Sequence, residues 1–145
     1  MTVSILMFTF YKIAGKFAPG SYPYAERYEI KASEKSLIQA TNKFKAKHPD
    51  IVPADSIGLV DGRSASPDDY WYHVYFYYPK EDQLLTTWIR ASDKTHSTFA
   101  FTAVSQGTGL GKWRLINKDL DSNENRLQKH QFEQRILKEI TKNLE

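Results

Sequence analysis

The chain has 145 residues, 41% hydrophobic and 26% charged, which are proportions typical of one globular domain and exclude a disordered chain. It contains no cysteine, so disulfides, thiolate metal sites and a cysteine nucleophile are excluded. The formal net charge is +3, but residues 1–48 hold eight Lys or Arg against three Asp or Glu. We therefore expect a single domain over residues 1–145, with a basic N-terminal third that favours an acidic partner.

The first expected element is a buried strand over Val3–Ile13. It lacks the charged leading region of a signal peptide, because Lys12 and Lys16 follow the apolar run. No run approaches the 18 or so apolar residues that a membrane span needs, so we expect a cytoplasmic protein without membrane contact. A loop rich in Pro and Gly follows, and Tyr24–Lys31 is the second expected strand.

A helix is expected after Ser33, which has the side chain of a good N-cap. It should end at Lys47–His48, because Pro49 disfavours helical dihedrals in the residue before it. The apolar stripe of this helix comprises Leu37, Ala40, Thr41 and Phe44.

Residues 50–69 form the least regular part of the chain, with Ile57–Val60 as a possible short strand. A loop of this length is uncommon unless it is functional or partly structured. Few apolar residues anchor it, so we expect this segment and Gly107–Gly111 to be the most flexible internal regions.

The most informative stretch is residues 70–78, in which seven of nine side chains are Phe, Tyr or Trp. Such a composition predicts a strand with aromatic residues on both faces. Two further strands, 84–91 and 96–105, follow after short polar turns and complete an antiparallel meander. The sequence therefore predicts an α+β fold with a single antiparallel sheet, built from the three-strand meander 70–105 and the N-terminal strands, packed against two helices.

The glycine-rich stretch before Lys112 lacks phosphate-loop spacing, since Gln106 and Trp113 stand where Gly and Ser or Thr are needed. We expect a hairpin loop there and an edge strand over 112–117. A terminal helix should start at Asp121 or Ser122, and Asp121 has capping-box spacing to Glu124. The apolar face of that helix comprises Phe132, Ile136, Leu137, Ile140 and Leu144.

Alternation assigns the two faces of the meander. One face should pack on the helices as the core. Its expected members are Val74, Phe76, Leu85, Ile89, Ala91, Phe99, Phe101 and Ala103.

The opposite face carries large amphipathic rings beside arginine, which is the composition that protein recognition surfaces enrich. The candidate partner-binding residues are Trp71, His73, Tyr75, Tyr77, Trp88 and Arg90, with Arg63 in the adjacent loop. We expect these side chains to be solvated in the free protein, with Thr98, Ala100 and Thr102 beside them. The alternative is that other segments cover this face and make it a second core layer.

These patterns favour a non-catalytic protein-binding module, such as a bacterial inhibitor or immunity-type protein that masks a partner protein. No metal, cofactor or catalytic constellation is expected. The first alternative is a single-stranded nucleic-acid-binding protein that stacks bases on the same rings. The second alternative is a small ribonuclease that uses His73 and His96. A homodimer that buries the aromatic face would also satisfy the physics.

Overall fold

The structure is a computed structural model that describes residues 9–10, 22–63 and 70–144. Its centre is one antiparallel sheet of six strands with the order β1-β2-β5-β4-β3, and β6 pairs with β5 on the side that β2 also uses. The strands are β1 Thr9–Phe10, β2 Glu26–Ile30, β3 Tyr72–Tyr78, β4 Gln83–Ala91, β5 Ser97–Gln106 and β6 Arg114–Leu115. The predicted α+β class and the β3-β4-β5 meander are confirmed.

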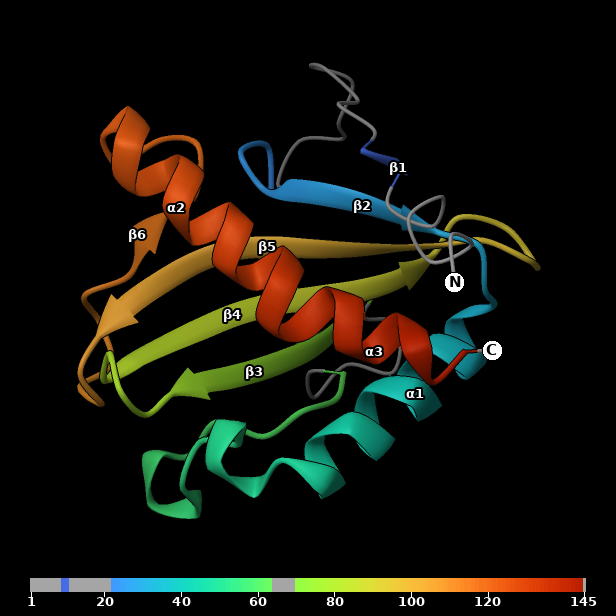
Figure 1. Ribbon diagram of the computed structural model, residues 1–145, viewed down its shortest axis with the longest axis horizontal. Helices are drawn as coiled ribbons and strands as arrows, with labels where there is room; N and C mark the ends of the chain where they lie inside the picture. The colour runs from blue at the N-terminus through green and yellow to red at the C-terminus, as the bar shows by residue number, and fades with distance from the viewer. Residues whose placement is uncertain (1–8, 11–21, 64–69, 145) are drawn as a thin grey trace.

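The helices lie on one face of this sheet (Figure 1). Their bounds are α1 Glu34–Lys47, α2 Ser122–Phe132, the π-helical turn η4 Glu133–Leu137 and α3 Lys138–Lys142, with single 3-10 turns at η2 Pro49–Ile51 and η3 Asp55–Ile57. The terminal helical arm crosses the sheet diagonally, whereas α1 and the segment after it lie along the β3 side (Figure 1). The predicted N-caps are confirmed, because the Ser33 and Asp121 side chains accept hydrogen bonds from the backbone of Ser36 and Glu124.

The core between the terminal helix and the sheet is centred on Phe132. Its ring centroid lies 4.7 Å from that of Phe101, 5.7 Å from Phe99 and 6.4 Å from Phe76. Because these rings come from β5 and β3, the strands on either side of β4, one helical side chain ties both outer strands of the meander to the helical layer. The predicted contact between the C-terminal helix and the Phe99/Phe101 face is therefore confirmed.

A β-bulge on β5 changes which residues face the core. The β4–β5 register shifts between Thr86 and Thr87, so that Thr102 is the extra residue on β5. The expectation that Ala103 faces the core is wrong: Ala103 pairs with Thr86 on the opposite face, and Val104 joins the core instead. Alternation fails beyond Phe101 because the bulge inserts one residue into the period of two.

Two other expectations need correction or restriction. Ile57–Val60 is not a strand, since Ile57 ends η3 and Gly58 adopts a left-handed φ of 85°. Of the expected strand Val3–Ile13, only Thr9 and Phe10 fall within the described residues, and they form β1. Among the helices of the described chain, none is long and apolar enough to cross a membrane.

Candidate functional site

The free edge of β3 is closed by a segment that is not a strand. The backbone N–H of Gly62 donates to the His73 carbonyl, and the His73 N–H donates back to the Gly62 carbonyl, both at 2.9 Å. Two residues further along β3, the Tyr75 N–H donates to Asp61 Oδ1 at 2.9 Å. The Tyr75 carbonyl accepts from Lys45 Nζ at 2.5 Å. These contacts satisfy the outward-facing backbone groups of the edge strand at two successive positions.

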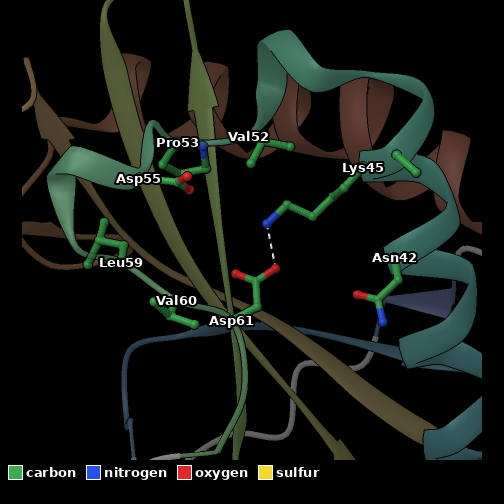
Figure 2. A pocket seen from close by; sticks show the side chains of 9 residues that line it. Asn42, Lys45, Val52, Pro53, Asp55, Leu59, Val60 and Asp61 are labelled. Atoms are coloured by element: carbon green, nitrogen blue, oxygen red, sulfur yellow. Dashed lines mark hydrogen bonds and ion pairs between the residues drawn. The ribbon is translucent and has the colours of Figure 1, made fainter.

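We call Lys45, Asp61 and Gly62, which contact the free edge of β3, the edge clamp. Lys45 and Asp61 also pair with each other, with Nζ and Oδ2 2.5 Å apart (Figure 2). The Lys45 side chain is only 10% exposed, and its Nζ lies 4.9 Å from the centroid of the Phe76 ring. Burial lowers the pKa of Lys45 below its usual value, while the Asp61 carboxylate acts in the opposite direction. The ammonium therefore holds α1, the loop and β3 together.

An open pocket of about 460 Å³ lies over this clamp, between α1 and the loop (Figure 2). The lining residues are Asn42, Lys45, Ala46, Val52, Pro53, Asp55, Leu59, Val60 and Asp61. Since the Lys45 amine donates to two acceptors already, its chemistry in the pocket is that of a structural ion pair.

A row of polar aromatic side chains runs along β3 on the sheet face away from the helices. This aromatic row comprises His73, Tyr75 and Tyr77, all of them half-buried. The rings of His73 and Tyr75 are nearly parallel, at 12°, with centroids 6.5 Å apart. The Tyr77 hydroxyl donates to Asp82 Oδ1 at 2.6 Å in the turn that follows. The row thus presents ordered rings on an edge strand whose backbone is already satisfied.

Trp88, on the neighbouring strand β4, is buried, although we expected its side chain to be solvated. It is 0% exposed, and its indole lies 5.8 Å from the Tyr22 ring, 6.3 Å from the Trp71 ring and 5.1 Å from the Arg27 guanidinium. The expectation of an exposed Trp88 is wrong because rings and a guanidinium from other segments cover it. We call the sheet face away from the helices the second face. Around Trp88 this face is covered by other segments and forms a small second core, which is the alternative given in the sequence analysis.

Burial extends over the central strand on this same face. Thr98, Ala100 and Thr102 are all at most 5% exposed, so the expectation that they lie on an open surface is also wrong. Among the described residues of this face, Thr86 and Glu29 are also partly exposed, and the accessible aromatic rings are those of the aromatic row and of one corner beside Tyr70.

At that corner Arg90 lies under an exposed ring. Its guanidinium is 5.5 Å from the centroid of Tyr70, which is 66% exposed, and 5.8 Å from that of Trp88. We call Tyr70, Trp71 and Arg90 the Arg90 corner. No carboxylate in the described part of the chain forms an ion pair with Arg90. The pKa of nearby Arg27 is lowered to about 10, chiefly by burial and further by the charge of Arg90.

Arg63, also a predicted partner-binding residue, lies at the margin of the Arg90 corner. It pairs with Glu34 at 2.7 Å, donates to the Tyr70 carbonyl at 3.2 Å, and its guanidinium lies 5.8 Å from the ring of Tyr72. Because Tyr72 packs against the helix-side core, Arg63 is at the sheet edge. The structure therefore brings together Trp71, Trp88 and Arg90, whereas Arg63 contacts the backbone of Tyr70 and forms its ion pair with Glu34.

The two histidines of the ribonuclease alternative are far apart. His73 and Ala100 both pair with Trp88, and His96 lies four residues before Ala100 in the β4–β5 turn. Two strand spacings and four residues of rise separate them by about 10 Å and about 13 Å in perpendicular directions. In this geometry they do not form one acid–base pair.

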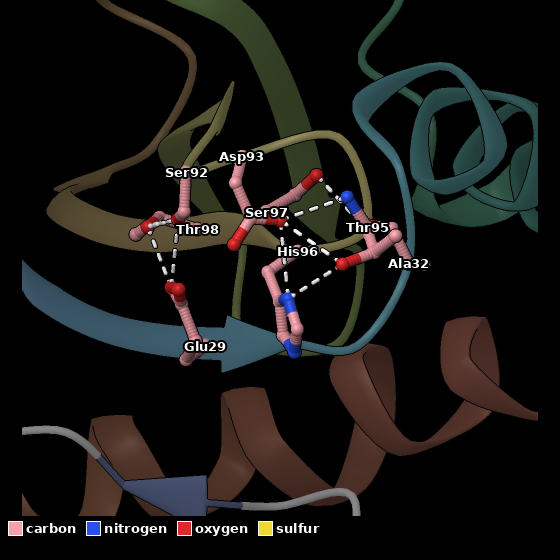
Figure 3. A network of polar contacts seen from close by, with 8 residues as sticks. All are labelled: Glu29, Ala32, Ser92, Asp93, Thr95, His96, Ser97 and Thr98. Carbon is pink, nitrogen blue, oxygen red and sulfur yellow. Dashed lines mark hydrogen bonds and ion pairs between the residues drawn. The ribbon is translucent and has the colours of Figure 1, made fainter.

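His96 instead belongs to a network of turn contacts (Figure 3). Its Nδ1 lies 3.1 Å from Asp93 Oδ1 and 2.9 Å from Thr95 Oγ1. The Ser97 hydroxyl next to it donates to the Ala32 carbonyl. The Thr95 hydroxyl also lies within hydrogen-bonding distance of Asp93 Oδ1, at 3.1 Å, so these bonds together fix the turn. Within the described ranges, no group of three His, Asp or Glu could hold a metal ion.

Sequence reasoning missed the edge clamp. Lys45 lies four residues after Thr41 and eight after Leu37, which places it on the buried stripe of α1. A charged residue at that position signals a buried partner, but nothing in the sequence identifies Asp61 as that partner.

Comparisons of the chain with protein-family models, with curated proteins and with solved structures gave no match.

We predict that Trp88→Ala destabilises the protein by about 3–5 kcal/mol, because it removes a fully buried indole from the second core. Tyr70→Ala, at the exposed ring beside it, should cost less than about 1 kcal/mol. Urea unfolding followed by circular dichroism measures both. Equal, small losses for the two variants would mean that the second face is open to solvent at Trp88.

A second prediction concerns the contribution of the edge clamp to the free energy of unfolding. Asp61→Asn should cost about 3 kcal/mol, because it leaves the buried Lys45 ammonium without its counter-charge. Combining it with Lys45→Met should cost clearly less than the sum of the two single changes, with a coupling of about 2 kcal/mol. The matched control is the more exposed Arg63–Glu34 pair, whose coupling should stay below about 1 kcal/mol. Additive losses for Lys45 and Asp61 would show that the two side chains act independently.

Proposed function

We propose that this chain is a non-catalytic binding protein that masks a partner protein, in the manner of a bacterial inhibitor or immunity-type protein, in the cytoplasm. The contact surface is the aromatic row together with the Arg90 corner. The observation that carries the proposal is an ordered row of half-exposed rings on a clamped edge strand.

Tyr and His rings suit this role because they offer large contact areas and polar tips while losing few rotors on binding. The Tyr77 hydroxyl bond to Asp82 and the parallel rings of His73 and Tyr75 restrict these side chains before any partner arrives. Preorganisation of this kind reduces the entropy cost of association. Trp88 is buried beside the row, so it supports these rings by packing and would not itself contact a partner.

The proposal is tested by affinity purification from the organism that encodes the chain, with matched variants as bait. Wild-type protein should retain a specific protein, and Tyr77→Ala and Tyr75→Ala should each lose most of it, because truncating central aromatic contacts typically weakens an interface strongly. The control bait is Leu127→Ala, which removes an exposed side chain from α2 on the helix side. All variants must unfold at denaturant concentrations close to wild type.

Retention of the same protein by all four baits would contradict the proposed surface. If single-stranded nucleic acid is retained instead, with a steep dependence on salt, the base-stacking alternative replaces the proposal. A wild-type chain that sediments as a dimer, and becomes monomeric in the Tyr77→Ala variant, would assign the surface to self-association.

A further inference from the structure

We infer that the Arg90 corner binds a carboxylate from an acidic segment of the partner protein. This inference rests on the proposed function and specifies the chemistry of the partner. It is carried by three features of Arg90: a guanidinium held between rings, the lack of a counter-ion among the residues that the structure describes, and a second arginine of like charge on the same indole.

The guanidinium is fixed by stacking. Arg90 lies within 6 Å of the ring centroids of Tyr70 and Trp88, the range in which a cation is attracted to an aromatic face. Its Nε is buried and has no hydrogen-bond partner in the described part of the chain. The side chain is nevertheless half-exposed, so its terminal nitrogens remain within reach of a ligand. A planar fork held in this way is suited to bidentate recognition of a carboxylate.

The carboxylate nearest in register is already occupied. Glu29 lies in the same cross-strand row as Arg90, with Thr98 between them. Its Oε1 accepts from the hydroxyls of Thr98 at 2.8 Å and Ser92 at 3.0 Å (Figure 3). Glu29 and Arg90 do not form an ion pair, although they share a face of the sheet. Within the described ranges, no carboxylate supplies the counter-charge of Arg90, and a carboxylate of a partner could supply it.

Arg27 raises the positive potential beneath this corner. Its guanidinium lies 5.1 Å from the centroid of the Trp88 ring, the same ring that Arg90 contacts. Arg27 is 7% exposed, so its charge acts on Arg90 through the protein interior and is screened less than a surface charge. An incoming carboxylate would interact favourably with both cations, although only Arg90 is accessible.

The corner fits one carboxylate better than a run of phosphates. Binding a nucleic-acid strand takes several cations along a groove, one for each backbone phosphate neutralised. The next guanidinium along the edge, that of Arg63, is already paired with Glu34. With one accessible guanidinium beside an exposed tyrosine, the surface matches an acidic side chain flanked by an apolar one.

The inference is tested with the full chain and a fluorescein-labelled peptide of alternating Glu and Gly, read by fluorescence anisotropy. The comparison probes are the same peptide with Gln in place of Glu, and an oligothymidylate of matching charge. The Gln peptide should bind at least about tenfold more weakly to wild-type protein, because it removes the charge-assisted bonds. The oligothymidylate should bind more weakly than the Glu peptide.

Arg90→Gln should reduce binding of the Glu peptide by at least about tenfold, and Arg90→Lys should recover only part of it, because an ammonium lacks the planar fork. The control is Arg126→Gln, an exposed arginine on α2, which should bind as wild type does. The comparison of Glu and Gln peptides on wild-type protein decides the matter even if an Arg90 variant folds poorly.

The inference is overturned if the Glu peptide does not bind, if the Gln peptide binds equally well, or if Arg90→Gln binds like wild type. It is also overturned if the oligothymidylate binds more tightly than the Glu peptide. Loss of the captured protein in the Tyr77→Ala bait together with no binding of the Glu peptide would retain the proposed function and reject only this inference. Failure of both experiments would reject both.

Discussion

The structure depends on how the edge of β3 is closed. An aromatic edge strand with unpaired backbone groups would be a site for pairing with other chains. Here the loop after α1 provides a backbone bridge through Gly62 and side-chain bonds from Asp61 and Lys45. One ion pair thus fixes α1, the loop and the edge strand relative to each other, and in doing so fixes the orientation of the aromatic row.

Closure of the edge also determines how a partner can bind. The backbone of β3 at His73 and Tyr75 already has partners, so addition of a partner strand at those positions would require the clamp to open. Recognition through side chains on the second face needs no such change. The buried cluster around Trp88 supports that face from below, which explains why so many aromatic residues are concentrated in one strand.

Much of this fold is legible in the sequence. Alternation and turn chemistry predict the meander, Ser33 and Asp121 predict the helix starts, and the helical spacing around Phe132 predicts the core contact. The two faces of the aromatic strand were harder to assign, because periodicity shows that both faces are apolar and does not show what covers each. Trp88 is buried by Tyr22 and Arg27, which are distant in sequence.

Two features had no local signal. The bulge at Thr102 moves Val104 into the core, and nothing around it in the sequence distinguishes a bulged strand from a regular one. The pairing of Lys45 with Asp61 joins an expected helix to an expected loop, and a partner across such a distance follows only from the tertiary structure. For the site, the sequence indicates the rings, whereas their division into support and surface requires the structure.

Asp61 and Gly62 complete the edge of β3 as a neighbouring strand would. Native-state hydrogen exchange of the His73 and Tyr75 amides tests this directly, because these are the donors to Gly62 and Asp61. Both amides should exchange as slowly as those of Val74 and Phe76, and Asp61→Ala, which removes the acceptor of the Tyr75 N–H, should speed exchange at Tyr75 selectively. Exchange of both amides in the wild-type protein at the rate of an exposed loop would contradict it.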